Sequence, residues 1–519
     1  MTGKALDSGV KVLVIGAGAM GSGIAQVAAL AGHPVYLYDM RADAVERGVA
    51  GIAADLAALV ARGKLDEAAR AQALGRLTAV TELGAAADAG LAIEAIVENL
   101  EVKQQLFGRL EALLGADAIL ASNTSSLSIT AMAAHLARPE RLAGLHFFNP
   151  APRMKLVEIV SGLATDPALA QTLHATACAW GKVAVHASST PGFIVNRVAR
   201  PYYAEAQRVL AEGAADPATL DAALREGCGF PMGPFELMDL IGHDVNFAVT
   251  DSVFDAFFGD RRYAPSLIQQ ELVAAGRLGR KSGRGFYEYA PGAIKPEPHA
   301  EEPHAGESAI AVVGDLGVAT PLVGRLEAAG VAIRRRPAEG SPEGPAAGAG
   351  WLEIGSARVA LSDGRTATRR AVDEGVPDLV LFDLCLDYAA TPRLVLAHAD
   401  QCGHGAWAAV AGTLQRAGLA LSRIDDVAGL IALRTVAMLA NEAADAVLAG
   451  VGTAADIDTA MRFGTNYPRG PLAWADVLGV GLVAGVLARL REHYGEERYR
   501  VSPLMQRIAL QPGRGFHAG

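Results

Sequence analysis

The stretch VLVIGAGAMGSGIAQ, residues 12–26, joins a short apolar run to a glycine-rich turn and then to the start of a helical pattern. In a G-x-G-x-x-G turn of this kind, the first glycine (Gly16) permits the tight bend and the second (Gly18) lets the backbone approach a pyrophosphate. The third, Gly21, lets helix and strand pack closely, and the helix N-terminus then faces the phosphates. The stretch predicts the opening strand, turn and helix of a dinucleotide-binding fold.

A second strand completes this fingerprint. Val35–Tyr38 is strand-like and ends at Asp39, about 20 residues after the turn, where a carboxylate can accept hydrogen bonds from ribose hydroxyls. A carboxylate there would repel a 2′-phosphate, so we expect NAD rather than NADP. Arg41 is the only nearby argument for NADP, and we interpret it as a solvated residue at a helix start.

The first 190 residues alternate strand-like runs with helical patterns, which is typical of a Rossmann-type, doubly wound parallel sheet. Between Asp43 and Leu77, two amphipathic stretches joined at Gly63-Lys64 predict an inserted helical hairpin that could close over a ligand. The expected strands are Lys11–Ile15, Val35–Tyr38, Leu91–Glu94, Ala118–Ala121, Leu142–Phe148 and Lys155–Val160.

Strand signals stop after Thr190, and an N-cap followed by proline at Asp216-Pro217 marks helical structure. Between Ala309 and Asp426 some βα character returns, but its turn, Gly314-Asp-Leu-Gly317, lacks the phosphate-binding fingerprint. We therefore predict an NAD-binding domain at 8–189, an all-α domain at 190–290, a Pro- and Glu-rich linker at 291–308, a degenerate α/β region at 309–426 and a second all-α domain at 427–512.

The second all-α domain is predicted from an internal repeat. A shift of 237 residues aligns Pro191–Gly242 with Ala428–Gly479 without a gap, and 16 of the 52 positions are identical. Most of these identities are Gly, Pro, Asp, Glu or Arg, whereas chance similarity between alanine-rich helices would favour alanine. We conclude that the helical domain is duplicated.

Composition narrows the class of protein. The net charge of −10 is spread along the chain, so a nucleic-acid partner is not expected. The four cysteines are widely separated and form no CxxC pair, which fits reduced thiols better than a disulfide framework or a metal site. No segment approaches the roughly 20 continuous apolar residues of a membrane span. We expect a soluble, cytoplasmic protein without a metal.

Polar side chains follow the strands of the first domain, where groups line the ligand crevice of an open α/β sheet. His146 is the suitable base for oxidising an alcohol, because imidazole titrates near neutral pH. A carboxylate such as Glu158 could fix its tautomer and stabilise the imidazolium. Ser125 and Asn196 could donate hydrogen bonds to the substrate oxygen. Taken singly, each residue could instead be structural.

These residues carry a resemblance to the L-3-hydroxyacyl-CoA dehydrogenase family, over nearly all of residues 10–290. It implies a catalytic His146–Glu158 pair, assisted by Ser125 and Asn196, that acts on (S)-3-hydroxyacyl-CoA. It also implies cofactor contacts from the glycine turn, including Ala19 and Met20, and from Asp39, Glu98, Lys103 and Asn149. The motifs are GAGAMGSGIAQ (16–26), EAIVEN (94–99), SNTSSL (122–127), GLHFFNP (144–150), PGFIVNR (191–197) and PMGPFE (231–236).

The full layout is similar to the family's two-module subtype found in phenylacetate degradation, whose substrates are 3-hydroxyadipyl-CoA or 3-hydroxybutyryl-CoA. Its all-α domains resemble that of 6-phosphogluconate dehydrogenase. Lys64, at the tip of the predicted hairpin, matches a lysine that the family places near CoA, although a solvated surface lysine is an equal alternative. The acyl chain length cannot be predicted, because one methylene changes binding by only about 1–3 kcal/mol.

The second copy keeps the pattern of the fold but lacks a candidate catalytic residue, because Leu433 stands where the first copy has Asn196. Single-module members of the family dimerise through their helical domain. We therefore expect residues 428–510 to pack against residues 190–289 of the same chain, and further homo-oligomers remain possible.

Two other functions stay open. A β-hydroxyacid dehydrogenase acting on free acids resembles this pattern, but that class has a catalytic lysine in the helical region and Pro191–Gly242 contains none. A non-catalytic nucleotide-binding protein on the same fold is the second, and the four candidate catalytic residues argue against it.

Overall fold

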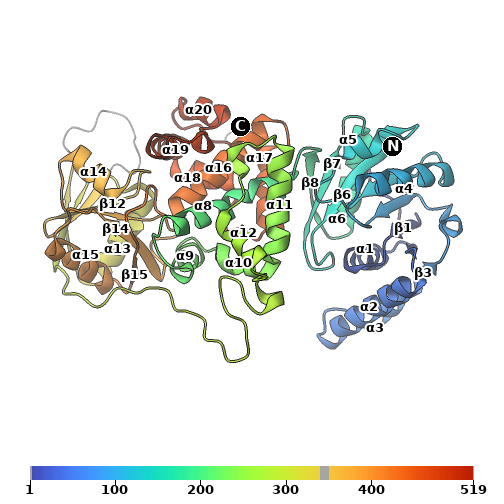
Figure 1. Ribbon diagram of the computed structural model, residues 1–519, viewed down its shortest axis with the longest axis horizontal. Helices are drawn as coiled ribbons and strands as arrows, with labels where there is room; N and C mark the ends of the chain where they lie inside the picture. The colour runs from blue at the N-terminus through green and yellow to red at the C-terminus, as the bar shows by residue number, and fades with distance from the viewer. Residues whose placement is uncertain (1–2, 339–349, 518–519) are drawn as a thin grey trace. The chain divides into compact units, whose positions relative to one another are not determined.

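The computed structural model describes residues 3–338 and 350–517 and divides into two compact units. The first unit comprises residues 1–197 and 449–465, and the second comprises residues 198–448 and 466–519. Residues 339–349, inside the predicted α/β middle region, lie outside the described residues. Each unit has its own sheet (Figure 1).

The first unit is built on an eight-stranded sheet in the order β3-β2-β1-β4-β5-β6-β7-β8. β1 pairs in parallel with both β2 and β4, so the chain winds outward in two directions from β1, and the prediction of a doubly wound Rossmann-type sheet is confirmed. The strands are β1 (Val12–Ile15), β2 (Val35–Tyr38), β3 (Leu77–Val80), β4 (Leu91–Glu94), β5 (Ile119–Ser122), β6 (Leu142–Phe147), β7 (Leu156–Ser161) and β8 (Val183–Ser188).

One pair departs from the predicted all-parallel sheet, because β6 and β7 are antiparallel. Only residues 148–155 connect them, and a parallel crossover needs a dozen or more residues. The antiparallel register sets His146 directly opposite Glu158.

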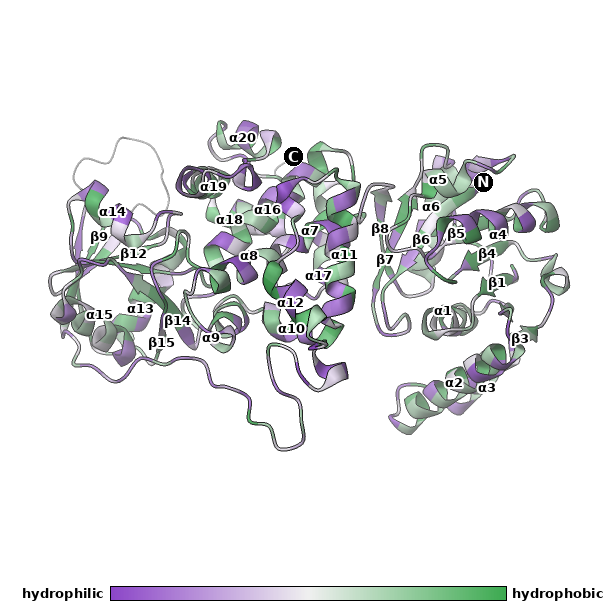
Figure 2. Cartoon of the chain, viewed as in Figure 1, coloured by the Kyte–Doolittle hydropathy of each residue, from purple (hydrophilic) through white to green (hydrophobic). Residues whose placement is uncertain are grey.

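The strands of this sheet are mainly apolar, and helices cover both of its faces (Figure 2). All four residues of β1 and β4 are buried, as expected for strands covered on both faces. The hairpin is present as α2 (Ala42–Ala61) and α3 (Glu67–Gly75), and the turn between them contains Gly63-Lys64. The other helices are α1 (Ala19–Leu30), α4 (Leu100–Leu113), α5 (Ile129–Ala133), α6 (Pro167–Ala179) and α7 (Val195–Val198).

A helix from the second half of the chain also belongs to the first unit. α17 (Ala454–Gly464) packs against β7 and β8, and the backbone N–H of Ser188 donates to the carbonyl of Val451 (2.8 Å). A Cβ atom on Gly464 would lie 2.6 Å from Leu156 and 3.0 Å from Val195, so this glycine allows the close approach.

The second unit holds both helical copies without α17 and without the start of the first copy up to Arg197. It also holds a seven-stranded sheet in the order β10-β9-β11-β12-β13-β14-β15. Its strands are β9 (Ala309–Val313), β10 (Ala332–Arg336), β11 (Trp351–Ile354), β12 (Ala357–Leu361), β13 (Leu379–Phe382), β14 (Arg393–His398) and β15 (Ala420–Arg423). The helices are α8 (Arg200–Ala211), α9 (Pro217–Ala222), α10 (Pro234–Ile241), α11 (His243–Ala256), α12 (Leu267–Ala274), α13 (Thr320–Ala328), α14 (Ala367–Glu374), α15 (His404–Arg416), α16 (Ala432–Leu448), α18 (Pro471–Leu478), α19 (Val480–Tyr494) and α20 (Pro503–Ala509).

The repeat extends beyond the helical domain. The same shift of 237 residues brings β6, β7 and α6 onto the starts of β13, β14 and α15. It sets Asp383 in the place of His146 and Val395 in the place of Glu158. Even the backbone of the repeated loop is shared, because Phe193 and its counterpart Leu430 both have positive φ, 47° and 52°. The second half is therefore a copy of the sheet edge as well as of the helices.

Inside the second unit, α8 of the first copy packs along α16 of the second. The buried carboxylate of Glu205 accepts hydrogen bonds from Arg434 and Tyr499. Its counterpart in the repeat, Glu442, accepts from Arg262 and Tyr263. Each copy's buried glutamate is thus bound by residues of the other copy.

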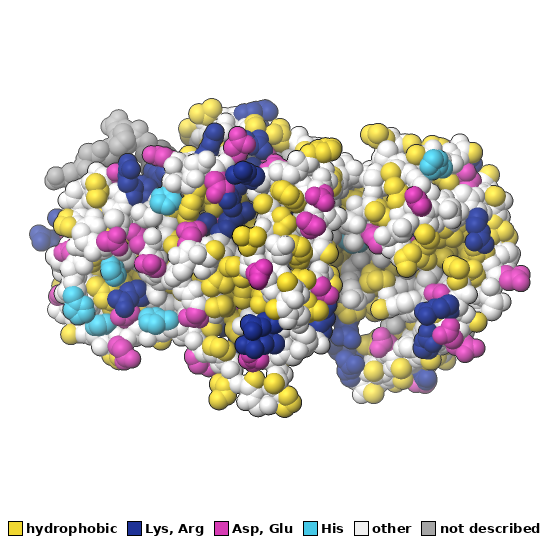
Figure 3. Space-filling view, in the orientation of Figure 1, with side chains coloured by type: hydrophobic (Ala, Val, Ile, Leu, Met, Phe, Trp, Pro, Cys, Tyr) yellow, Lys and Arg dark blue, Asp and Glu magenta, His cyan; other side chains and the backbone are white. Residues whose placement is uncertain are grey.

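Three further features concern the surface charges, the thiols and the apolar helices. Acidic and basic side chains are interspersed on the face shown in Figure 3. All four cysteines are free thiols. Among the described residues, no single helix is long and apolar enough to cross a membrane; α18 and α19 pass such a test only as a pair bent by 101°.

Candidate active site

The glycine turn has the shape that a dinucleotide requires. Gly16 has a φ of 104°, and a Cβ on Gly21 would lie 1.7 Å from the carbonyl oxygen of Gly16. A Cβ on Gly18 would meet nothing within 4 Å, so this glycine faces open space where a pyrophosphate can approach. Ala19 and Met20 open helix α1, whose N-terminus completes an anion-binding end.

Asp39 lies beside the glycine turn. Its carboxylate accepts hydrogen bonds from the backbone N–H of Ala17 (2.9 Å) and of Arg41 (3.0 Å). The carboxylate is thereby held beside the glycine turn at the end of β2. These residues fit NAD, since the turn leaves room for the phosphates and the carboxylate stands where the ribose hydroxyls would lie.

A buried network supports the next part of the site, and sequence reasoning missed its centre, Glu94. This fully buried carboxylate bonds to the ammonium of Lys103 (2.5 Å), to the hydroxyl of Ser122 (2.6 Å) and to the backbone N–H of Ile96 (2.7 Å). Lys103 is 1% exposed and also reaches Glu98 at 3.2 Å. Lys103 therefore orients Glu98 from within the core. The only signal in the sequence was a carboxylate at the last position of a buried strand, four residues before Glu98.

Glu98 accepts several hydrogen bonds from the loop that carries Ser125. Its Oε1 accepts hydrogen bonds from the Thr124 hydroxyl (2.6 Å) and from the backbone N–H of Ser125 (3.0 Å) and Ser126 (3.2 Å). Burial works against ionisation, but these bonds and the charge of Lys103 together lower the pKa of Glu98. An ionised Glu98 fixes the loop after β5, with the Ser125 hydroxyl at 3.4 Å from the same oxygen.

The catalytic pair predicted from sequence is brought together. His146 Nδ1 lies 2.6 Å from Glu158 Oε2, and both side chains are buried. The other carboxylate oxygen of Glu158 accepts the backbone N–H groups of Ile194 (3.1 Å) and Val195 (3.0 Å). Glu158 therefore links the imidazole to the loop that carries the next residue, Asn196.

Asn196 and the C-terminal end of strand β6 complete the arrangement. The Asn196 amide donates to the backbone carbonyl of Ser125 (3.3 Å), so these two predicted donors are neighbours. The side chain of Asn123, which was not among the predicted site residues, accepts from the N–H of Phe147 (2.8 Å) and fixes the end of β6 beside His146. Asn149 follows two residues later. Lys64 is exposed on the turn between α2 and α3.

The fold and these contacts define a class, a dinucleotide-dependent dehydrogenase with a histidine–carboxylate pair beside two hydrogen-bond donors. The chain belongs to the 3-hydroxyacyl-CoA dehydrogenase family. The model of the family's NAD binding domain matches residues 11–190, that of its C-terminal domain matches residues 192–289 and 429–516, and a 3-hydroxybutyryl-CoA dehydrogenase reduced Rossmann-fold domain matches residues 359–427. The protein is an NAD-dependent enzyme of this family.

Three relatives illustrate the range of similarity. The chain is 47% identical over 503 residues to 3-hydroxyadipyl-CoA dehydrogenase of Escherichia coli K12, covering 97% of this chain and 98% of the relative. A crystal structure of 3-hydroxybutyryl-CoA dehydrogenase from E. coli K12 matches with a TM-score of 0.87 at 45% identity, over 97% of this chain and 99% of that one. A 3-hydroxybutyryl-CoA dehydrogenase of Bradyrhizobium diazoefficiens is 45% identical, covering 56% of this chain and 97% of the relative.

Proposed function

We propose that the chain interconverts (S)-3-hydroxyacyl-CoA and 3-oxoacyl-CoA, with His146 as the base. The observation that carries this is the 2.6 Å bond from Nδ1 to Glu158, which assigns the ring proton of neutral His146 to Nδ1 and leaves Nε2 to accept the substrate's hydroxyl proton. The carboxylate then stabilises the imidazolium. When bound, NAD supplies the acceptor for the hydride that leaves C3.

The remaining residues orient the substrate and cofactor. Ser125 and Asn196 donate to the substrate oxygen as its charge changes, and Glu158 keeps the Asn196 loop in register with the base. The glycine turn with Asp39, together with Glu98 and Asn149, would hold NAD, and Lys103 acts by orienting Glu98. Lys64 is the proposed contact for a CoA phosphate, as it is exposed on the hairpin turn.

The test of the chemistry is His146→Ala, assayed by NADH oxidation with acetoacetyl-CoA. The proposal expects activity near background with the unfolding midpoint retained. Unchanged activity would refute His146 as the base.

For the substrate, we propose 3-hydroxyadipyl-CoA in phenylacetate degradation, because the relative with that name matches the chain almost end to end. 3-Hydroxybutyryl-CoA is the alternative, supported by the name of the matching crystal structure. Comparing kcat/KM for the two substrates decides between them, and a strong preference for the shorter one would contradict the first. We place the enzyme in the cytoplasm, which suits its free thiols.

We further propose that the second half replaces a partner subunit. The crossed contacts at Glu205 and Glu442 and the seating of α17 on the first sheet support this. Truncation after residue 290 removes α17 and uncovers Glu205. The proposal expects an insoluble, dimeric or weakly active fragment, and a soluble, fully active monomer would refute it.

A further inference from the structure

Five residues of the first unit form a closed ring of hydrogen bonds and ion pairs, with Glu94 at its centre. The Glu94 carboxylate bonds to the Ser122 hydroxyl (2.6 Å) and to the ammonium of Lys103 (2.5 Å). Ser122 Oγ accepts the backbone N–H of Thr124 (3.2 Å), and the Thr124 hydroxyl donates to Glu98 (2.6 Å). Lys103 closes the ring, because its Nζ lies 3.2 Å from the other carboxylate oxygen of Glu98.

The ring is part of the core and reaches the surface at one point. Glu94 ends β4 and Ser122 ends β5, and the two residues are partners in the parallel register. Four members of the ring are at most 1% exposed, namely Glu94, Lys103, Ser122 and Thr124. Glu98 differs from them, because 37% of its side chain is exposed. The buried part of the ring therefore sets the position of a carboxylate at the candidate site.

Glu98 in turn fixes the backbone of Ser125. Its Oε1 accepts the N–H groups of Ser125 (3.0 Å) and Ser126 (3.2 Å) beside the Thr124 hydroxyl. The Ser125 hydroxyl is one of the two donors proposed for the substrate oxygen. Its placement therefore depends on where Glu98 lies.

The charges of the ring determine the position of Glu98. Two carboxylates share the ammonium of Lys103, which lies nearer to Glu94 (2.5 Å) than to Glu98 (3.2 Å). Attraction between charges is strong in such a buried place, because water screens it little. Without the charge of Glu94, Lys103 would keep Glu98 as its one carboxylate partner among the described residues and would draw it toward the core. Glu98 would then move away from the N–H of Ser125.

We propose that Glu94 is a positioning residue of the dehydrogenase, which balances the charge of Lys103 and so leaves Glu98 bound to the loop of Ser125. The inference rests on the proposed function and adds to it a residue that touches neither substrate nor cofactor. Glu94 acts on kcat through Ser125 and on cofactor binding through Glu98.

The test is Glu94→Gln, alone and combined with Ser125→Ala. The new amide oxygen can accept from Ile96 and Lys103, and its NH₂ group can donate to Ser122, so the change removes charge and keeps shape. The assay is NADH oxidation with acetoacetyl-CoA. We expect Glu94→Gln to lower kcat about 10-fold in the wild type but less than about 2-fold in Ser125→Ala, because a residue that acts through the Ser125 hydroxyl has no further effect once it is gone.

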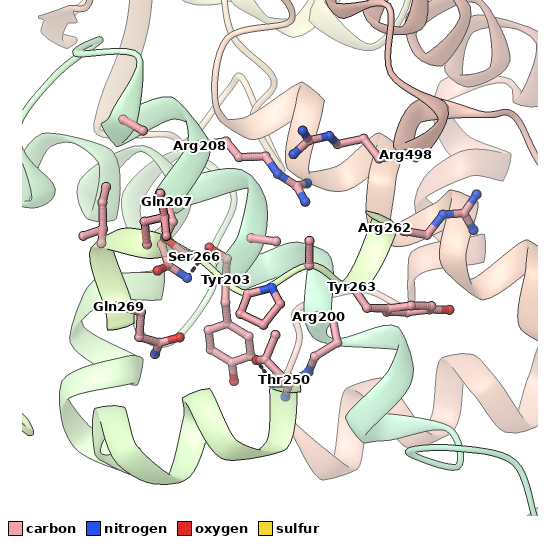
Figure 4. A pocket seen from close by; sticks show the side chains of 16 residues that line it. Arg200, Tyr203, Gln207, Arg208, Thr250, Arg262, Tyr263, Ser266, Gln269 and Arg498 are labelled. Carbon is pink, nitrogen blue, oxygen red and sulfur yellow. Dashed lines mark hydrogen bonds between the residues drawn. The ribbon is translucent and has the colours of Figure 1, made fainter. Parts of the chain in front are cut away.

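The matched control is Glu442→Gln, which removes the charge of an equally buried carboxylate in the second unit. Glu442 accepts from Arg262 and Tyr263, two residues on the wall of a cavity of about 360 Å³ (Figure 4). This variant should lower the unfolding temperature and leave kcat and the KM for NADH unchanged. Glu94→Gln should raise the KM for NADH, because Glu98 is the proposed cofactor contact.

A second variant guards against a folding defect. Ser122→Ala opens the ring on its other side without removing a charge. It should give a smaller loss of kcat, which also disappears in Ser125→Ala.

Three results would overturn the role of Glu94. They are losses of kcat that add in the double variant of Glu94 and Ser125, an equal rise in the KM for NADH in Glu442→Gln, and full kcat in Ser125→Ala. In each case wild type would still oxidise NADH with acetoacetyl-CoA. If wild type itself does not, the proposed function fails.

Discussion

Arg434 of the second helical copy forms a buried ion pair with Glu205 of the first, with Nε and Oε2 2.7 Å apart and exposed fractions of 1% and 0%. Arg434 also donates to Glu212 and to the hydroxyls of Tyr494 and Tyr499. A charge in such a place is tolerated because each of the three guanidinium nitrogens donates to at least one acceptor. The pair ties the two copies together at their common core.

Removing one partner of that pair should therefore cost stability. We expect Arg434→Met to lower the free energy of unfolding by about 3 kcal/mol, because it leaves Glu205 buried with less compensation. Urea denaturation measures this. As a control, Arg47→Met breaks the exposed pair with Asp43 and should change stability by less than about 1 kcal/mol. Equal effects of the two variants would show that burial does not decide the value of the pair.

Glu158→Gln should separate orientation from charge at the candidate base. The amide can still accept the N–H groups of Ile194 and Val195, but it cannot stabilise the imidazolium of His146. We expect kcat to fall about 10²- to 10⁴-fold with little change in the unfolding temperature. The control is His243→Gln, because His243 forms a similar buried pair with Asp239 (2.7 Å) in the second unit. That variant should lose stability and keep kcat; the reverse pattern would contradict the assignment.

The packing of α17 should affect the loop at Ile194 and Val195, which binds Glu158. Gly464→Ala places a Cβ against Leu156 and Val195, and the N–H of Val195 holds Glu158. We expect a stability loss of about 1–3 kcal/mol and a lower kcat. Gly485→Ala on α19 meets open space and serves as the control. Full activity of the Gly464 variant at an unchanged unfolding temperature would show that this contact does not support the site.

Because of Lys182, the free energy of unfolding should depend on pH in the alkaline range. Its ammonium donates to the carbonyl of Met154 (2.9 Å), and burial lowers its pKa from 10.5 to about 8. Below about pH 8 both the folded and the unfolded chain hold the proton, and the folded state carries the full cost of the buried charge. Between about pH 8 and 10.5 the unfolded state binds more protons, so the free energy of unfolding rises with pH.

The measurement is the difference in unfolding temperature between wild type and Lys182→Met from pH 7 to 10. It should shift in favour of wild type as the pH rises. Lys4→Met removes an exposed lysine and is the control. A flat difference for Lys182→Met would mean that this lysine keeps an ordinary pKa.

Local sequence patterns were enough to predict much of the fold. The strand–turn–helix at residues 12–26 was predictable because Gly16 and Gly21 each meet a local steric requirement that only glycine satisfies, and Gly18 leaves space for a pyrophosphate. β3 and β8 were missed. β3 lies at the sheet edge with three of its four residues at least partly exposed, so its sequence lacks the apolar run of a buried strand. β8 has an alternating burial pattern that is short and partly exposed, and helical signals follow it in the sequence, so the strand was not predicted.

By itself, the sequence determined the dinucleotide turn and the duplicated helical domain, because spacing along the chain specifies local structure and repeats. It also proposed the four candidate catalytic residues, from their positions after predicted strands and from the resemblance of their motifs to a family. Only the tertiary structure decided that His146 faces Glu158 across an antiparallel pair, that Glu94 supports Glu98 through Lys103, and that α17 joins the first unit. These contacts depend on strand register and burial, which join residues far apart in the chain and leave no periodic trace in it.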